Sequence, residues 1–307
     1  MRALILGGNG FIGSHLTDAL LARGHAVRSY DKYAELYREP LTGVEYLVGD
    51  FGNRGLLADA LHGVDVVFHL VSTTVPKTSN DDPAFDVQSN VIDTLGLLDL
   101  CVARKIARVV YISSGGTVYG EPASLPIRED SQTTPLCSYG ITKLCVEKYL
   151  ELYRRLHGLD YVILRPSNPY GPRQNPGSIQ GAISVFLGNV ATGQPIRIWG
   201  DGSVVRDYLY IQDLAEGICR AAETGARHRL FNLGSGSGVS LRQIVEVVDA
   251  VTGRKSNVEF LPRRQFDVPE IYLDVTRAAE ELDWRPTVGL RDGVARTWDF
   301  VRELLAG

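Results

Sequence analysis

A tyrosine and a lysine four residues apart are the pair in this sequence best suited to proton transfer. Tyr139 and Lys143 stand at the two ends of a Y-G-I-T-K run, and residues i and i+4 of a helix share one face. A free tyrosine has a pKa near 10 and is a poor base at neutral pH. A lysine ammonium about 6 Å away, at an effective dielectric constant of about 20, lowers that pKa by about 2 units. The pair therefore predicts a base for an alcohol or sugar hydroxyl.

A glycine-rich turn near the start of the chain predicts an anion-binding site. Gly7, Gly10 and Gly13 recur every third residue, and Gly8, Gly10 and Gly13 match the G-x-G-x-x-G pattern. Glycine lets the turn close, lets a pyrophosphate approach backbone N–H groups, and lets the following helix pack tightly on the strand. The N-terminus of that helix also attracts an anion. This turn is typical of dinucleotide binding.

An acidic residue downstream favours NAD over NADP. Asp31 ends the next predicted strand, 18 residues after Gly13, where a carboxylate accepts bonds from the ribose hydroxyls and repels a 2′-phosphate. The positive charge of its neighbour Lys32 would instead favour NADP. Asp50 and Phe51 follow the third predicted strand, where they either flank the adenine or only pack in the core.

Strands and helices alternate through the first half of the chain, which indicates βαβ units and a parallel sheet. Its strands read as nearly continuous apolar runs, as in a sheet covered on both faces. The predicted strands are 2–6, 26–31, 44–48, 64–71, 107–113, 159–164 and 230–233. The predicted helices are 11–23, 53–61, 84–104, 136–157, 182–192, 209–223, 240–251 and 290–304.

We therefore expect an α/β fold: a doubly wound, Rossmann-type parallel sheet with a smaller α/β domain that binds the substrate. Residues 1–165 form the predicted NAD-binding domain, and residues 207–235 return to its sheet. Residues 166–206 and 236–307 form the second domain, because composition shifts to Pro, Gly, Asn and Gln after Pro166. A cleft between the two is the expected ligand site.

Composition and sequence pattern argue against several other classes of protein. The chain has 307 residues, 44% of them hydrophobic, and a net charge of −4, which argues against a broad basic surface for nucleic acid. No stretch is long and apolar enough to span a membrane, and no signal peptide is expected at the start. The six histidines and four cysteines show no metal-ligand spacing, so we expect no metal and a reducing cytoplasm.

Taken together, these motifs resemble those of the extended short-chain dehydrogenase/reductases. Within that family the sequence is most similar to the nucleotide-sugar epimerases and dehydratases, and among these to the UDP-glucose 4-epimerases. The resemblance covers essentially the whole chain. It rests on an ordered set of motifs: Gly7 to Gly13, Asp31, Gly49-Asp50, His69-Leu70, Asn90, Ser113 to Gly120, Tyr139 with Lys143, Arg165 to Arg173, Gly200 to Gly202, Arg206 to Tyr208, and Arg263-Arg264 with Asp267.

The resemblance implies a role for each matching residue. Tyr139 would be the catalytic base, and Lys143 would bind the nicotinamide ribose. The residues implied in NAD binding are Gly7, Gly10, Phe11, Ile12, Gly13, Asp31, Lys32, Asp50, Phe51, Leu70, Val71, Ser72, Asn90, Ser113, Tyr139, Lys143 and Pro166. The residues implied in nucleotide-sugar binding are Ser114, Tyr139, Asn168, Arg173, Trp199, Arg206, Arg264 and Asp267. Guanidinium groups match the oxygens of a diphosphate, whereas Trp199 either packs near the base or belongs to the core.

One position departs from the family pattern. The family carries a third Ser or Thr directly after the Ser113-Ser114 pair, and here that position is Gly115. Three explanations are open. In the first, Ser114, Thr117 or a water replaces the missing hydroxyl. In the second, Tyr139 and Lys143 act alone, more slowly. In the third, the site is altered or inactive. The sequence favours Ser114 and Thr117 as further catalytic residues.

The implied reaction is a nucleotide-sugar 4-epimerisation through a transient 4-keto sugar. A ketoreductase, a decarboxylase, a dehydratase or a regulatory NAD-binding protein are the alternatives. Dehydratases of the family carry an Asp-Glu pair where this chain has Gly116 and Thr117, which argues against dehydration. The residues do not determine which nucleotide base the substrate carries or whether its sugar is N-acetylated. A homodimer is expected, with helices 84–104 and 136–157 in the contact through Leu95, Leu98, Val146, Leu150 and Tyr153.

Overall fold

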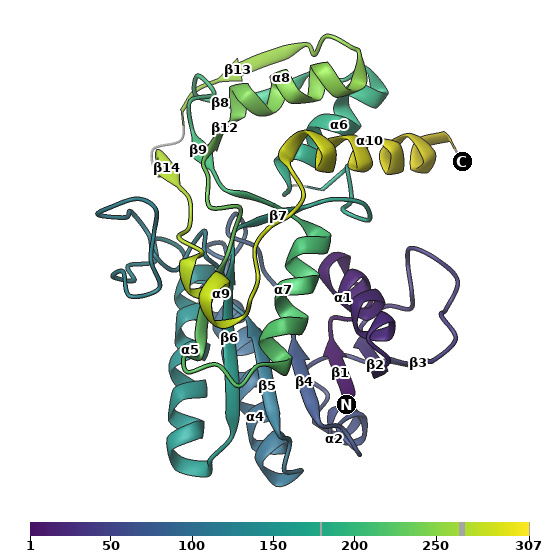
Figure 1. Cartoon of the computed structure of the whole chain (residues 1–307), viewed down its shortest axis with the longest axis vertical. Coiled ribbons are helices and arrows are strands. Elements are labelled where there is room, and N and C mark those ends of the chain that lie inside the picture. The colour runs from purple at the N-terminus through teal and green to yellow at the C-terminus, as the bar shows by residue number, and fades with distance from the viewer. Residues whose placement is uncertain (179, 264–267, 307) are drawn as a thin grey trace.

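The computed structural model describes residues 1–178, 180–263 and 268–306. A seven-stranded parallel sheet dominates it, with the strand order β11-β6-β5-β4-β1-β2-β3 (Figure 1). The order reverses direction between β1 and β4, as in a doubly wound sheet, so the predicted fold class is confirmed. The strands are β1 (Arg2–Leu6), β2 (Ala26–Asp31), β3 (Val44–Val48), β4 (Val66–His69), β5 (Arg108–Ile112), β6 (Asp160–Pro166) and β11 (Leu230–Leu233).

Helices cover both faces of this sheet, because its strands are apolar on both sides. Neighbouring residues of β1 show the alternation: Ile5 belongs to the core cluster under α1 (Phe11–Ala22) and α7 (Ile211–Glu223). Leu4 belongs to the cluster on the opposite face. That face is covered by α2 (Arg54–Ala60), α4 (Asp93–Ala103) and α5 (Ser138–His157).

The helix predicted over residues 84–104 is interrupted. It consists of α3 (Pro83–Asp86), a π-helical turn η1 (Val87–Ile92) and α4. Asn90 donates a side-chain hydrogen bond back to the carbonyl of Asp86 at 3.2 Å, in competition with the regular backbone ladder. Wide turns of this kind are frequent at functional sites, and this one packs against α5.

The second half of the chain adds three small sheets and a helical layer at one end of the large sheet (Figure 1). Helices α6, α8 and α10 pack against one another. The strands are β7 (Asn168–Tyr170), β8 (Ile196–Trp199), β9 (Val205–Arg206), β10 (Tyr208–Tyr210), β12 (Val239–Ser240), β13 (Val258–Leu261) and β14 (Glu270–Ile271). The helices are α6 (Ala182–Thr192), α8 (Leu241–Thr252), α9 (Thr276–Glu281) and α10 (Leu290–Ala306).

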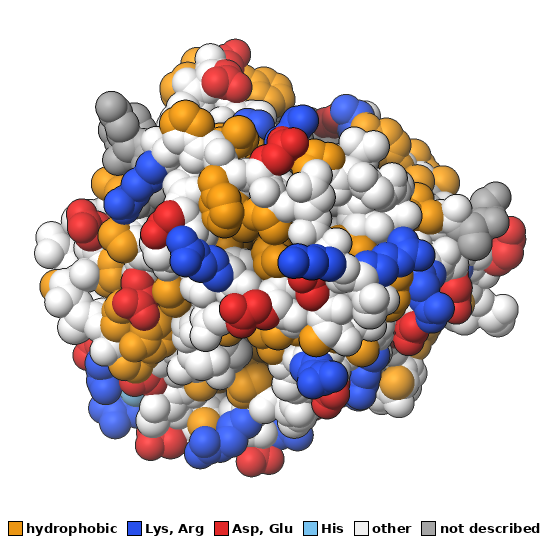
Figure 2. Space-filling model, turned by 90° about the horizontal axis from the view of Figure 1, so that it is seen from above, with side chains coloured by type: hydrophobic (Ala, Val, Ile, Leu, Met, Phe, Trp, Pro, Cys, Tyr) orange, Lys and Arg blue, Asp and Glu red, His pale blue; other side chains and the backbone are white. Residues whose placement is uncertain are grey.

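Charges of both signs are interspersed on the surface above these small sheets (Figure 2). Acidic, basic and apolar side chains alternate there, in keeping with the small net charge of −4. Within the described ranges, no helix is long and apolar enough to cross a membrane.

The set of side chains expected at a subunit contact is partly wrong. Leu98, Val146 and Leu150 are almost completely buried in the core of the chain itself, because they fill the space between α4, α5 and the sheet. The exposed apolar side chains of this region belong to neighbouring positions: Phe85, Val87 and Ile92 on α3 and η1, and Ile141, Leu152 and Leu156 on α5.

Candidate active site

The glycine turn connects β1 to α1 at the carboxyl edge of the sheet. Gly7 has φ +83°, a conformation that glycine adopts without strain, and its N–H donates to the carbonyl of Tyr30 at 2.9 Å. A Cβ on Gly13 would lie 2.1 Å from the Gly7 oxygen. The turn therefore accepts no side chain at Gly13, and its tight backbone at a helix N-terminus fits a pyrophosphate.

Asp31 lies beside this turn at the end of β2. Its Oδ2 accepts the backbone N–H of Asn9 at 3.0 Å, and its Oδ1 accepts that of Tyr33 at 3.2 Å. The Asn9 side chain donates to the Tyr33 carbonyl at 2.7 Å. These bonds fix the carboxylate next to the glycine turn, where a ribose would lie.

The other residues predicted around the adenine differ in burial. The Lys32 ammonium is 3.9 Å from a carboxylate oxygen of Asp50, and both side chains are exposed. Phe51 is buried, with its ring centroid 5.0 Å from that of His69. Phe51 therefore packs in the core, and its contact with the adenine stays a prediction.

The segment after β4 passes directly over the glycine turn. A Cβ on Gly7 would lie 3.5 Å from backbone atoms of Leu70 and Val71. The side chain of Ser72, which follows them, is near enough to the Tyr139 hydroxyl to lower the pKa of that phenol. This segment therefore joins the glycine turn to the predicted base.

Tyr139 and Lys143 lie on one face of α5, beside the end of β5. The Lys143 Nζ is 5.5 Å from the centre of the Tyr139 ring. The same Nζ donates to the carbonyl oxygen of Ile112 at 3.0 Å and is 5.1 Å from the centre of the Tyr111 ring. The predicted i and i+4 geometry is present, and a backbone carbonyl fixes the ammonium.

Burial determines the pKa values of this pair. Burial raises the pKa of Tyr139 to about 12, although the hydrogen bond with Ser72 acts in the opposite direction. Desolvation is the largest cause of this raised pKa, so the phenol keeps its proton at neutral pH in the protein alone. The effect of Lys143 together with bound NAD⁺ stays a prediction. Burial also lowers the pKa of Lys143 to about 8, so the ammonium keeps its proton at neutral pH.

Ser113 lies in a buried polar cluster beneath these two residues. Its hydroxyl donates to a carboxylate oxygen of Glu147. The same carboxylate receives two bonds from the guanidinium of Arg165, one of them at 2.9 Å. The hydroxyl of Ser113 thus connects β5, α5 and β6 within the protein.

A side chain at position 115 would be crowded by its neighbours. A Cβ there would lie 2.6 Å from the Leu273 side chain and 3.0 Å from the carbonyl oxygens of Arg165 and Pro166. Thr117, two residues on, has a buried hydroxyl oxygen without a hydrogen-bond partner. Its backbone oxygen would meet a Cβ on Gly140, the residue after Tyr139, at 2.8 Å. The unused hydroxyl therefore belongs to a residue in contact with the first turn of α5.

Asn90 positions the segment after β4. Its Oδ1 accepts the Thr73 N–H at 3.1 Å. Its Nδ2 donates to the Thr73 hydroxyl at 2.8 Å and to Asp86 Oδ1 at 2.9 Å. An orienting role for Asn90 is consistent with these bonds.

The other predicted substrate residues follow β6 in the chain. The Asn168 amide donates to the Asp207 carbonyl at 2.8 Å. Arg173 pairs with Asp18 of α1 at 2.8 Å, and Arg206 donates to the carbonyls of Val205 and Val268. Two further predicted residues, Arg264 and Asp267, lie outside the described residues.

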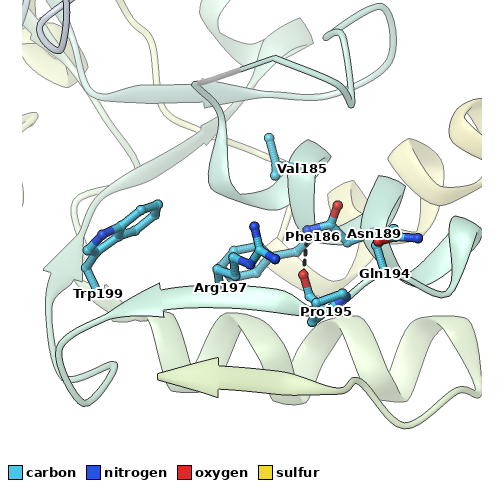
Figure 3. A pocket seen from close by; sticks show the side chains of 7 residues that line it. All are labelled: Val185, Phe186, Asn189, Gln194, Pro195, Arg197 and Trp199. Atoms are coloured by element: carbon cyan, nitrogen blue, oxygen red, sulfur yellow. Dashed lines mark hydrogen bonds between the residues drawn. The ribbon is translucent and has the colours of Figure 1, made fainter. Parts of the chain in front are cut away.

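A separate cavity of about 290 Å³ lies between α6 and β8. In Figure 3, the side chains of Arg197 and Trp199 rise from the same face of β8. Asn189 of α6 closes the other end by donating to the Pro195 carbonyl at 3.1 Å (Figure 3). With 39% of its surface exposed, Trp199 is not a core residue.

Sequence reasoning missed two buried carboxylates beside Tyr139 and Lys143. Glu147 is four residues after Lys143, and Asp86 is four residues before Asn90, so helical spacing was an available signal. Both side chains are almost completely buried. In the part of the chain that the structure describes, no cluster of His, Cys, Asp and Glu could hold a metal ion.

Known proteins similar to this chain match it along its length. The model of the NAD dependent epimerase/dehydratase family matches residues 3–234. A UDP-glucose 4-epimerase of Mycolicibacterium smegmatis is 37% identical, covering 98% of this chain and 99% of that protein. The crystal structure of a UDP-glucose 4-epimerase with UDP-glucose from Thermotoga maritima has a TM-score of 0.94 at 33% identity, covering 99% of this chain and 100% of that one. A UDP-glucose 4-epimerase of Thermus thermophilus in complex with NAD has a TM-score of 0.91 at 33% identity, covering 98% and 99%.

Proposed function

The chain belongs to the NAD-dependent epimerase/dehydratase family, and from this premise we propose that it is an NAD-dependent nucleotide-sugar 4-epimerase. Its substrate is a UDP-hexose, such as UDP-glucose and UDP-galactose or their N-acetyl forms. The observation that carries the proposal is the position of Tyr139 and Lys143. They lie on one helix face next to the segment that crosses the glycine turn.

The residues around the glycine turn fit NAD. The cradle formed by Gly7, Gly10 and Gly13 admits a pyrophosphate, and Asp31 is fixed to accept the ribose hydroxyls. Lys143 holds the nicotinamide ribose, with Phe11, Ile12, Leu70, Val71, Ser72 and Pro166 around the cofactor. Bound NAD supplies the hydride acceptor and donor for C4 of the sugar.

Tyr139 is the base that takes the proton of the 4-hydroxyl and later returns it. With a pKa raised to about 12 by burial, the phenol by itself stays protonated at neutral pH. Positive charge must therefore lower this pKa during catalysis. Lys143 would supply part of it, because its pKa of about 8 keeps the ammonium charged, and a bound NAD⁺ would add the positive charge of its nicotinamide ring.

A second hydroxyl shares the proton with Tyr139, and we assign it to Thr117. Its oxygen is buried and has no partner within the protein, and a buried polar group of this kind is costly unless a ligand satisfies it. Ser114 lies on the same segment and contacts the sugar. Position 115 itself is closed by Leu273.

The second domain holds the nucleotide part of the substrate. In this proposal Asn168, Arg173 and Arg206 bind the diphosphate and Trp199 lies near the base. The family resemblance assigns Arg264 to the diphosphate and Asp267 to the ribose, and both lie outside the described residues. The cavity beside Trp199 has a volume of about 290 Å³, at the lower limit for small-molecule sites. This size suits one planar base.

The proposal extends to domains, assembly and location. Residues 1–165 with 207–235 bind NAD, and residues 166–206 with 236–307 bind the nucleotide sugar. The protein is a homodimer that pairs α5 and the α3–α4 segment through their exposed apolar side chains. All four cysteines are free, which suits the reducing cytoplasm.

The test is product identification with the purified protein. We expect it to carry NAD and to interconvert UDP-glucose with UDP-galactose, or the two N-acetyl forms, in a panel that includes dTDP- and GDP-sugars. Tyr139→Phe keeps NAD binding and loses about 10²- to 10⁴-fold in turnover. Full activity of Tyr139→Phe overturns the assignment of the base. Bound NAD with no sugar interconverted across the panel overturns the epimerase function.

A further inference from the structure

Asp86 is a completely buried carboxylate beside the proposed base. It has 0% exposed surface and ends α3, directly before the π-helical turn η1. Burial of a charged carboxylate is costly unless several hydrogen bonds compensate for the lost water. Its two oxygens accept bonds from four uncharged groups on three parts of the chain.

Each oxygen binds a different part of the site. Oδ2 accepts the hydroxyl of Ser138 at 2.6 Å and that of Thr142 at 3.3 Å. Ser138 directly precedes Tyr139, and Thr142 directly precedes Lys143, in the first turns of α5. Oδ1 accepts the Asn90 amide at 2.9 Å and the hydroxyl of Thr74, which follows the segment that crosses the glycine turn.

These bonds connect the backbone of Tyr139 to the segment that carries Ser72. The single hydroxyl proton of Thr142 is shared between Asp86 Oδ2 and the Tyr139 carbonyl, which is 3.0 Å away. Thr142 therefore links the backbone of the base to Asp86. The Ser72 hydroxyl donates to the Thr74 carbonyl at 3.1 Å, so the Thr74 anchor also places Ser72. We propose that Asp86 is the positioning residue of this site, which locks α5 to residues 72–74 and so aligns Tyr139 with Ser72. The inference deepens the proposed function and rests on it for the role of Tyr139.

The charge of Asp86 acts on the same two residues. Its negative charge raises the pKa of Tyr139 and that of Lys143. The other ionisable groups around the pair are Tyr111 on β5, His69 on β4, Glu147 on α5 and Cys137 before α5. Asp86 thus keeps the proton on Lys143 as well as holding the helix.

Asp86→Asn removes the charge and keeps the shape. The new amide nitrogen can face Ser138 and Thr142, whose hydroxyl oxygens can accept, while the amide oxygen still accepts from Asn90 and Thr74. We expect the pKa of Tyr139 in the NAD-loaded protein to fall by about 1 unit. Its readout is the ultraviolet absorbance of the phenolate against pH, taken as the difference between each protein and its Tyr139→Phe counterpart.

The alkaline limb of turnover against pH is expected to move to lower pH as well, because Lys143 loses its proton earlier. Asp213→Asn is the matched control. Asp213 is a buried carboxylate that accepts bonds from Thr287 and Val288 near α7, and its substitution should leave both pH curves in place.

The outcomes separate this inference from the proposed function. A phenolate titration that is unchanged in folded Asp86→Asn overturns the inference, as does an equal shift in Asp213→Asn. A shifted titration in a protein that interconverts no sugar supports the role of Asp86 and refutes the epimerase. Asp86→Ala tests the hydrogen bonds separately: we expect turnover to fall at least about tenfold, since four donors lose their acceptor. Unchanged turnover in that variant also contradicts the inference.

Discussion

At the scale of single residues, the environment of Gly115 bears on the departure from the family pattern. A Cβ at this position would crowd the end of the Leu273 side chain and two backbone carbonyls. This crowding disfavours a hydroxyl residue at position 115 and supports our proposal that Thr117 supplies the second hydroxyl. The Thr117 oxygen is buried and has no hydrogen-bond partner in the protein.

The first prediction concerns stability at Gly115. Gly115→Ala should lower the free energy of unfolding by about 1 to 3 kcal/mol, because the added methyl overlaps Leu273 and the chain must shift. Gly116→Ala is the matched control, since a Cβ there meets nothing within 4 Å. Urea unfolding of both variants checks this. Equal stabilities for the two would show that the space at residue 115 is open.

The second prediction separates catalysis from stability at Thr117. Thr117→Val removes the hydroxyl and keeps the volume, so stability should hold or rise slightly, since no hydrogen bond is lost within the protein. Turnover should fall at least tenfold, or about 1.4 kcal/mol. Steady-state kinetics and thermal unfolding are the measurements. Full turnover in Thr117→Val, together with a loss in Ser114→Ala, would transfer the role to Ser114.

At the scale of helices and strands, the sequence predicted the large sheet well, because its strands are continuous apolar runs. Four of them, β1, β2, β3 and β11, have the predicted bounds. The small sheets were not predicted, since strands of two to four residues such as β9 and β14 carry no measurable periodicity. The π-helical turn was missed for a related reason: it depends on the side chain of Asn90 bonding to the backbone of Asp86, which local propensity does not encode.

The candidate site was also predictable only in part. Motifs placed Tyr139, Lys143 and the glycine turn, because each has a fixed spacing. The pKa of Tyr139 was not predictable, since it depends on how deeply the phenol is buried. Ser113, Glu147 and Arg165 come from three separate parts of the chain, so only the folded chain shows that Glu147 binds the Ser113 hydroxyl.

The third prediction concerns the ion pair that joins α5 to β6. Glu147→Gln leaves the buried guanidinium of Arg165 without its counter-charge, which should cost about 3 to 5 kcal/mol of stability. Glu151→Gln breaks the exposed pair with Arg155 on the same helix and should cost less than about 1 kcal/mol. Denaturant unfolding gives both values. A cost for Glu147→Gln no greater than that for Glu151→Gln would mean that water reaches Arg165.

At the scale of the whole molecule, the exposed apolar side chains of α5 suggest how two copies meet. Ile141, Leu152 and Leu156 are spaced by 11 and 4 residues, which places them on one helical face. Phe85 and Ile92 lie on the neighbouring segment. A second copy of the chain would cover both.

The fourth prediction tests this contact. Leu152→Glu combined with Leu156→Glu should turn the dimer into a monomer at micromolar concentration, because two charges would be buried in an apolar contact. Leu304→Glu, which changes an exposed leucine on α10, is the control and should remain dimeric. Sedimentation analysis of the wild type, the double variant and Leu304→Glu measures the oligomeric state of each. A wild-type protein that is monomeric contradicts the proposed assembly outright.

The return of the chain to the large sheet limits how this protein can be divided. Strand β11 pairs with β6 at the edge, and α7 lies with α1 over the core cluster of one face. Residues 1–165 alone would end with the β6 edge unpaired and the apolar side chains of Val110, Ile112 and Val162 uncovered. Such a fragment would aggregate. The first 165 residues are therefore no portable module: any gene fusion or transplant that keeps the fold of the large sheet must carry the chain through β11, including the intervening residues 166–206.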